Sequence, residues 1–302
     1  MTSQPLPIVH HPHYRIPLRA GHRFPMSKYG YLREALEARG LLAPGRYVAP
    51  APAEASQIAL AHAPGYVDRA LSQTLEEAEV KAIGLPFTAA LARRAQLTAA
   101  GTTLAAWLAL EHGIALNAAG GSHHAMRGGG AGFCVFNDVA VAAVNLLAQG
   151  VAAPFLVFDA DVHQGDGTAE IFAGDPRVFT ASIHAANNYP AEKARSDLDI
   201  ALPDGVEDGA YLAALEAALD RALAEARPRL VFYNAGVDVV ADDRLGRLAL
   251  SEAGLRARDR LVLTRLSAEG LPVCVVMGGG YGDAPTIAER HAVVFEEAAR
   301  LA

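Results

Sequence analysis

Short apolar runs alternate with longer amphipathic stretches along the chain. The runs are typical of strands that are buried on both faces, and they lie at residues 8–10, 113–117, 155–158, 177–184, 230–234 and 271–277. Helical patterns separate them, at residues 27–40, 53–62, 65–71, 88–111, 137–149, 168–172, 208–226, 251–269 and beyond 283. This order predicts an α/β fold: one domain over residues 1–302, with an open, mostly parallel sheet covered by helices on both faces.

Residue types at the helix starts and in the connections refine this prediction. Ser27, Asn137 or Asp138, and Ser251 are expected to begin helices, because short polar side chains cap free backbone N–H groups. Residues 44–53 are expected to form a Pro/Ala-rich connection, and residues 187–204 an irregular loop. Residues 11–23 hold three histidines and three arginines without regular ligand spacing. We interpret this segment as a mobile loop at a rim rather than a metal site.

The run Phe155–Phe158 becomes polar abruptly, with Asp159, Asp161 and His163 at alternate positions. If the segment stays extended, these three side chains share one face. Burying carboxylates and an imidazole at the end of a strand is costly, and a bound cation would offset that cost. One carboxylate and one imidazole make half of a zinc site, and a catalytic zinc ion usually has three protein ligands and one open position.

Polar clusters follow three other strands, at His123-His124, at Asp238 and at residues 278–281. In parallel sheets, ligands bind beyond the carboxyl ends of the strands, so these clusters are expected to meet the Asp159–Asp166 segment. Asp238 is the predicted third zinc ligand, although a residue in this position could also be a helix cap or part of a surface loop. Two carboxylates and one imidazole leave room for water and for a substrate carbonyl.

The two adjacent histidines are the predicted acid/base pair. Histidines in a Gly-rich loop are commonly just exposed, but these follow an apolar strand, and Asp159 and Asp166 are available to orient them. Tyr281 follows three glycines and is interpreted as a hydrogen-bond donor to an oxyanion rather than as a turn aromatic. No phosphate-binding glycine motif occurs.

Composition narrows the class of protein. The net charge of −7 and the lack of a Lys/Arg-rich run argue against nucleic-acid binding. No apolar run approaches the roughly 20 residues that span a bilayer, and residues 1–5 do not resemble the start of a signal peptide. Cys134 and Cys274 cannot make a disulfide framework, so a reducing, cytoplasmic setting is expected.

Five segments in chain order carry a resemblance to a known family: Gly120–Ala125, Gly132–Asp138, Asp159–Gly167, Tyr233–Asp238 and Gly278–Tyr281. They resemble the zinc-dependent histone deacetylase family and imply its arginase-like α/β fold. Three further features are most similar to class IV and its bacterial relatives. These are Pro7–Pro12, the step His163-Gln164 in place of a histidine pair, and Asp243–Leu248.

The resemblance implies zinc-dependent hydrolysis of an N-acyl amide. By this resemblance, His124 is the general base, supported by Asp166. His123, supported by Asp159, stabilises the transition state and protonates the amine. Tyr281 and zinc polarise the carbonyl while water attacks.

The resemblance also implies substrate and ion contacts. The carbonyl of Gly132 would accept the substrate amide hydrogen, and Phe133 would line the acyl-lysine tunnel. The remaining substrate contacts, the last two at the rim, are Gly280, Tyr189 and Leu245. Structural potassium would bind, largely through main-chain oxygens, at Asp159, Asp161, His163, Ser182 and Ile183. A second potassium site would lie near Phe172, Asp175 and Val178.

The expected substrate is an acylated lysine in a peptide or protein, and class IV resemblance raises the possibility of long fatty acyl groups. An acetylpolyamine or other small-amide hydrolase is the alternative. A two-manganese ureohydrolase is disfavoured because Gly165 and Val240 stand where further carboxylates would be needed. A non-catalytic binding module should have lost Tyr281, a histidine or a zinc ligand, and all are present.

Overall fold

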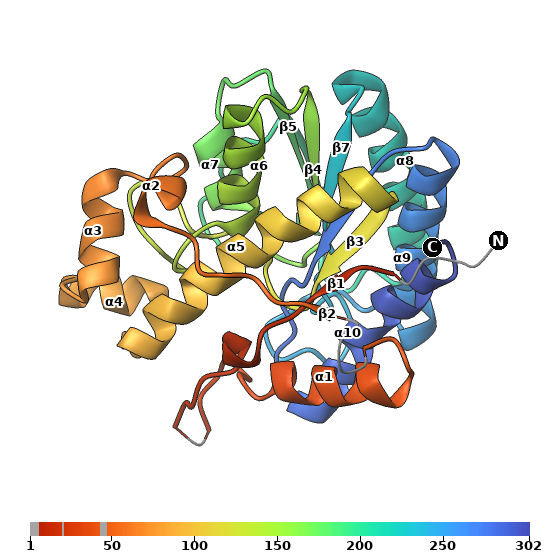
Figure 1. Cartoon of the computed structure of the whole chain (residues 1–302). Coiled ribbons are helices and arrows are strands. Elements are labelled where there is room, and N and C mark those ends of the chain that lie inside the picture. Colours follow the sequence, from red (N-terminus) through yellow and green to blue (C-terminus); the bar gives the residue numbers. More distant parts are fainter. Residues whose placement is uncertain (1–5, 20, 43–46) are drawn as a thin grey trace.

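The computed structural model describes residues 6–19, 21–42 and 47–302, and its strands form one eight-stranded sheet (Figure 1). The order across the sheet is β2-β1-β3-β8-β7-β4-β5-β6, and every neighbouring pair is parallel. The strands are β1 (Ile8–Val9), β2 (Tyr47–Val48), β3 (Ile114–Asn117), β4 (Phe155–Asp159), β5 (Val178–Ala185), β6 (Leu198–Leu202), β7 (Leu230–Asn234) and β8 (Val273–Val276). The predicted parallel α/β sheet is confirmed.

Helices cover both faces of this sheet. They are α1 (Lys28–Ala38), α2 (Ala55–Ile58), α3 (Pro64–Ser72), α4 (Glu77–Ile83), α5 (Ala89–His112), α6 (Asp138–Ala148), α7 (Asp166–Phe172), α8 (Asp208–Ala226), α9 (Glu252–Ala268) and α10 (Ala284–Ala299). A 3₁₀ turn, η1 (Pro12–Tyr14), follows β1. Helix α5 packs on β1, β3 and β8 and beside α6, while α8 packs on β4, β5 and β6 and leads through α9 and α10 to α1. Figure 1 shows α2–α4 grouped to one side.

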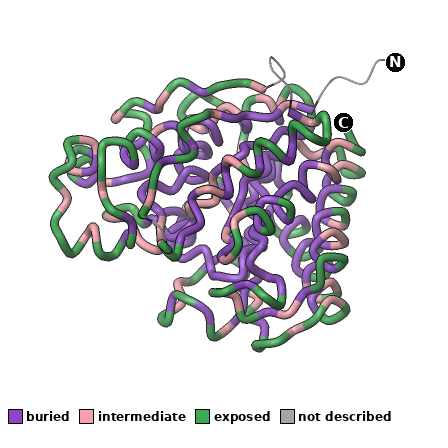
Figure 2. Tube along the Cα trace, turned by 90° about the horizontal axis from the view of Figure 1, so that it is seen from below, coloured by how far each residue is buried: buried purple, intermediate pink, exposed green. Residues whose placement is uncertain are grey.

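The core follows the apolar runs. All residues of β3, β4, β7 and β8 are buried, as expected for strands that helices cover on both faces. Figure 2 shows these buried segments through the middle of the molecule, with exposed residues along the outer helices. Within the described residues, no helix is both long and apolar enough to cross a membrane.

Three elements were not expected from the sequence. Residues 187–204 contain β6, an edge strand that pairs with β5, so the prediction of a wholly irregular loop was wrong. β6 is half exposed and only five residues long, which gives a weak pattern. β2 lies within the predicted connection 44–53, of which residues 44–46 fall outside the described part. Helix α4 begins with a capping box between Glu76 and Glu79.

Helix caps confirm most of the predicted starts. The side chains of Asn137, Ser251 and Asp283 accept hydrogen bonds from the first turns of α6, α9 and α10. Ser27 is the exception, because it has helical backbone angles and its side chain makes no capping hydrogen bond. A cap normally has extended backbone angles, so α1 starts without one.

The strand register brings four polar loops to the same edge of the sheet. Asp159 at the end of β4 is the register partner of Asn234 in β7, which is in turn the partner of Val276 in β8. The loops after β3, β8, β7 and β4 therefore leave the sheet side by side. This edge carries all the polar clusters that the sequence singled out.

Candidate active site

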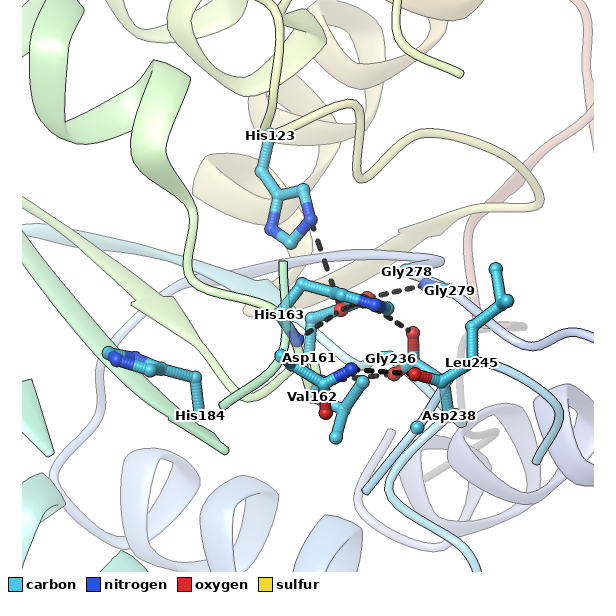
Figure 3. A network of polar contacts seen from close by, with 12 residues as sticks. His123, Asp161, Val162, His163, His184, Gly236, Asp238, Leu245, Gly278 and Gly279 are labelled. Carbon is cyan, nitrogen blue, oxygen red and sulfur yellow. Dashed lines mark hydrogen bonds and ion pairs between the residues drawn. The ribbon is translucent and has the colours of Figure 1, made fainter. Parts of the chain in front are cut away.

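Three buried side chains, those of Asp161, His163 and Asp238, converge beyond β4 and β7 (Figure 3). Their ligand atoms all lie within 4.8 Å of one another. Nδ1 of His163 lies 3.0 Å from Oδ1 of Asp161 and 3.1 Å from Oδ2 of Asp238, so one nitrogen faces both carboxylates. The structure thus brings together the three residues that the sequence predicted as zinc ligands.

The alternating pattern predicts that Asp159, Asp161 and His163 share one face of a strand, but in the structure they do not. β4 ends at Asp159, and Asp161 and His163 lie in the turn that follows. Backbone N–H groups fix this turn: that of His163 donates to Oδ1 of Asp161 (2.9 Å), and that of Val162 donates to Oδ1 of Asp238 (3.0 Å). Asp159 is the last residue of β4, and its carboxylate contacts His123 instead.

The electrostatics of this cluster suit a cation. Burial and the charge of Asp161 raise the pKa of Asp238 to about 7. Oδ2 of Asp238 is buried without a hydrogen-bond partner in the described part of the chain, although it lies near His163. A buried carboxylate that lacks a donor is costly unless a cation is present. A borderline metal such as zinc accepts this set of oxygen and nitrogen donors, so the residues fit a metal ion.

Gly279 is necessary for the compactness of this cluster. A Cβ at position 279 would overlap the carboxylate of Asp238 and lie 3.1 Å from Oδ2 of Asp161. Its backbone N–H also donates to Oδ2 of Asp161 at 2.5 Å. The glycine run after β8 therefore lets the backbone pass directly against the metal-ligand candidates.

The two adjacent histidines have different carboxylate partners. Nδ1 of His123 lies 2.7 Å from Oδ2 of Asp159, and Nδ1 of His124 lies 2.6 Å from Oδ1 of Asp166. Both imidazoles are buried, and their ring centroids are 4.1 Å apart. In both pairs Nδ1–H donates to a carboxylate, which leaves Nε2 of each ring for chemistry.

Their environments separate their pKa values. Burial opposes charge on His123, but the carboxylates of Asp159 and Asp161 outweigh it and raise the pKa of His123 to about 9. Burial and the neighbouring charge of His123 lower the pKa of His124 to about 4, against the opposing effect of Asp166. His123 therefore holds a proton more readily than His124 does. One ring can donate a proton and the other can accept one.

Tyr281 lies beside His163 of the metal-ligand cluster. It is buried, and its ring centroid is 6.1 Å from that of His163. Burial, followed by the charges of Asp238 and Asp161, raises the pKa of Tyr281 well above its ordinary value. The phenol therefore keeps its proton and can donate a hydrogen bond to an oxyanion.

Lys28 is a buried residue of the site that sequence reasoning missed. Its Nζ lies 3.4–3.5 Å from the carbonyl oxygens of Gly278, Gly279 and Gly280 and 5.9 Å from the ring centroid of Tyr281. It thereby ties the start of α1 to the loop that carries Tyr281. A lysine is almost never fully buried without partners, and nothing in the local pattern around position 28 distinguishes it from a surface residue.

A hollow of about 780 Å³ opens above this chemistry. His124, His163 and Tyr281 lie at its base, and Gly132 and Phe133 line its wall. Gly132 and Phe133 both have positive φ, of 54° and 69°, and such strain in a non-glycine residue is concentrated at functional sites. The lining also includes Tyr189 and Leu245, the predicted rim residues, and His22 from the predicted rim loop.

A second, inner cavity of about 30 Å³ continues beyond His123 and Tyr281. It is lined by Gly278 and Gly279 and, among the described residues, not by Gly280. A Cβ on Gly280 would meet Val237 and Ile287, and its backbone carbonyl accepts a hydrogen bond from Lys28; its contact with substrate stays a prediction.

Two of the residues that resemblance assigns to potassium, Asp161 and His163, belong to the cluster itself, and the others lie in β4 and β5. Asp159 and Ser182 are register partners in β4 and β5, and Ile183 follows Ser182. For the second site, the turn before β5 contains a hydrogen bond from the N–H of Asp175 to the carbonyl of Phe172 (2.9 Å) and one from the N–H of Val178 to Asp175 (3.2 Å). Each of these two carbonyls accepts one backbone hydrogen bond and keeps a second lone pair.

Comparisons with known proteins agree with this arrangement. Residues 22–297 match the family model described as the histone deacetylase domain. An uncharacterized protein from Picosynechococcus sp. is 46% identical over 275 residues, which cover 91% of this chain and 92% of the relative. Histone deacetylase 2 from Arabidopsis thaliana is 30% identical over 86% of this chain and 70% of its own length.

A solved structure matches the same fold. The crystal structure of the HDA15 HD domain superimposes with a TM-score of 0.80, covering 98% of this chain and 88% of that chain at 22% sequence identity. The family model spans nearly the whole chain and therefore decides the relationship. The chain belongs to the histone deacetylase family.

Proposed function

We propose that this protein hydrolyses N-acyl-lysine amides in peptides or proteins, with a zinc ion held by Asp161, His163 and Asp238. Membership of the histone deacetylase family supports deacetylase-type hydrolysis in general. The observation that carries the specific proposal is the histidine pair. Two adjacent imidazoles, each bonded through Nδ1 to its own carboxylate, lie beside a three-ligand cluster, and His124 also lines the hollow.

When bound, zinc supplies a Lewis acid that polarises the acyl carbonyl and lowers the pKa of a water molecule. The residues of the chain do the remaining work. His124 accepts the proton of the attacking water. The hydroxyl of Tyr281 donates a hydrogen bond to the oxygen of the carbonyl as charge develops there. His123 protonates the departing amine, so that one amide and one water become a carboxylic acid and an amine.

The acyl group is proposed to be short. A lysine that belongs to a protein must enter from the hollow, so its acyl group points inward, past Tyr281. The inner cavity of about 30 Å³ holds on the order of one or two water molecules. This volume favours acetyl over a long fatty acyl chain. The class IV assignment, which raised the fatty-acyl hypothesis, remains a proposal from the sequence motifs.

We also propose that the protein binds a structural potassium ion. Asp159, Asp161, His163, Ser182 and Ile183 would contribute, largely through main-chain oxygens. The support is that Asp159 and Ser182 lie side by side in β4 and β5, and that Asp161 and His163 follow β4 directly.

The alternative functions are less well supported by the donor set. A two-manganese ureohydrolase needs extra carboxylates, and among the described residues one cluster of His, Cys, Asp and Glu fits a metal. A Cβ at Gly165 would lie 2.5 Å from Oδ2 of Asp159, which leaves no room there for a bridging carboxylate. An acetylpolyamine hydrolase uses the same chemistry and is separated from the main proposal by substrate charge.

The test is hydrolysis of one lysine peptide that carries a series of acyl groups from acetyl to myristoyl. Matched samples are measured with and without a zinc chelator, and N-acetylspermidine is included as a small cationic substrate. We expect chelator-sensitive turnover that is fastest for acetyl. Turnover that rises with chain length would contradict the short-acyl proposal, and turnover of the polyamine alone would contradict the peptide proposal.

A further inference from the structure

The rim of the hollow is strongly cationic. Four arginines line it, and we call them the rim arginines: Arg19, Arg23, Arg244 and Arg247. All four are exposed. Among the described residues that line the hollow, no aspartate or glutamate occurs. The protein as a whole has a net charge of −7, so this cationic rim is a local feature rather than a consequence of composition.

Three of the four rim arginines have free guanidinium groups. Arg247 is the exception, because its Nη1 lies 3.1 Å from Oδ2 of Asp204. Within the described part of the chain, Arg19, Arg23 and Arg244 have neither an ion pair nor a side-chain hydrogen bond. Guanidinium groups without a protein partner at the mouth of a binding hollow are available to carboxylates of a ligand.

The acidic residues nearest to Arg244 are already engaged. The carboxylate of Asp243 is buried and accepts hydrogen bonds from the backbone N–H groups of Leu245, Gly246 and Tyr281, at 2.7–3.0 Å. The carboxylate of Asp283 accepts hydrogen bonds from Thr286 and caps α10. Neither one neutralises the rim by a direct ion pair.

We infer that the substrate segment is an acidic peptide, with Asp or Glu residues next to the acylated lysine. This inference rests on the proposed function and specifies its substrate class. The acylated side chain reaches the base of the hollow, so the residues on either side of that lysine remain at the rim, where the free arginines lie. Opposite charges across an interface guide association and exclude partners of the wrong sign.

The negative charge belongs on the flanking residues rather than on the acyl group. The inner cavity is about 30 Å³. Arg94, which lines it, donates to the carbonyl of Tyr14 (2.8 Å) and lies over the ring of Tyr29. Asp161 and Asp238 also lie close to the base. The same rim disfavours acetylpolyamines, because their free ammonium groups would meet the arginines.

The experiment uses three peptides with a central acetyl-lysine, and they differ only in the two residues before it and the two residues after it. These four positions are all Asp in the first peptide, all Asn, the uncharged near-isostere of Asp, in the second, and all Lys in the third. The kcat/KM of zinc-loaded protein is measured at about 25 mM and about 200 mM salt, on either side of a Debye length of roughly 10 Å. The test variant combines R19Q, R23Q and R244Q. A control for the loss of three charges combines R221Q, R229Q and R300Q, of which Arg221 and Arg300 pair with Glu225 and Glu297. These three arginines are exposed, and they lie near the opposite edge of the sheet, where β7 begins and α10 ends.

We expect the Asp peptide to exceed the Asn peptide on the order of tenfold at low salt, since each exposed ion pair contributes roughly a 1.5- to 5-fold effect. The preference should appear mainly in KM, weaken at high salt and disappear in the test variant but not in the control. Equal rates for the three peptides, or a preference for Lys, would overturn the acidic-substrate inference and leave the proposed function intact. If the test variant fails to fold, the salt dependence of the wild-type preference still decides the matter. Absence of turnover with every peptide would instead overturn the proposed function and the inference with it.

Discussion

The carboxylate of Asp166 determines which nitrogen of His124 can act as a base, and D166N tests this. The carboxylate can only accept, so Nδ1 of His124, 2.6 Å away, carries the proton and Nε2 is free. An Asn side chain has the same shape, but it can rotate so that its NH₂ group donates to Nδ1. The ring then carries its proton on Nε2 and cannot accept one from water.

The size of the effect follows from this contact. Both partners are buried, so the bond to the charged imidazole that forms in the transition state is charge-assisted, and replacing it by a neutral bond loses roughly 1–2 kcal/mol. Loss of Asp166 also removes an influence that raises the pKa of His124, which is already lowered to about 4 by burial and His123. Together with the wrong tautomer, we expect kcat to fall about 10²- to 10⁴-fold, the usual contribution of a general base.

The assay compares kcat and KM of zinc-loaded wild type and D166N on the acetyl-lysine peptide. The metal content and the melting temperature are measured on the same samples. D242N is the control, because Asp242 is exposed, pairs with Arg290 and lies outside the lining of the hollow. We expect D166N to keep about one hundredth of the wild-type kcat or less. The reasoning is refuted if fully folded, zinc-loaded D166N keeps more than about one fifth of it.

Three further predictions concern the metal, Lys28 and the buried histidine His62. Zinc added to chelated protein at about 100 times its Kd should raise stability by roughly 2.7 kcal/mol, seen as a higher melting temperature, and D238N should abolish this shift. K28M should lower kcat about tenfold or more with little change in KM, because the loop that carries Tyr281 loses its three-carbonyl anchor; unchanged kcat in a folded variant would contradict this role. His62 accepts a hydrogen bond from the N–H of Asn137 at 2.9 Å and bonds the carbonyl of Met126 at 2.8 Å, and burial lowers its pKa from 6.5 to about 4. The folded protein therefore favours neutral His62. The free energy of unfolding should be highest above pH 6.5 and should fall by up to about 3 kcal/mol as the pH drops toward 4. Denaturant titrations should show that H62Q loses this part of the pH dependence.

Features that depend on local pattern could be predicted from the sequence. The runs that became β3, β4, β7 and β8 are apolar throughout, so burial on both faces left a continuous signal. The edge strand β6 (Leu198–Leu202) is half exposed and was read as a loop, because its pattern depends on pairing with β5. The sequence predicts Ser27 as the cap of α1, but Ser27 has helical backbone angles and its side chain makes no capping hydrogen bond.

The candidate site shows the same division. The sequence by itself determined which residues can bind a metal or transfer a proton, because Asp161, His163, Asp238 and the histidine pair follow buried strands whose ends must meet at one sheet edge. Only the tertiary structure decided how they are used. It ended β4 before Asp161, turned Nδ1 of His163 toward both carboxylates, and buried Lys28 against a loop some 250 residues away in the chain. Protonation state and contact depend on distances between segments remote in sequence, and no local pattern encodes those distances.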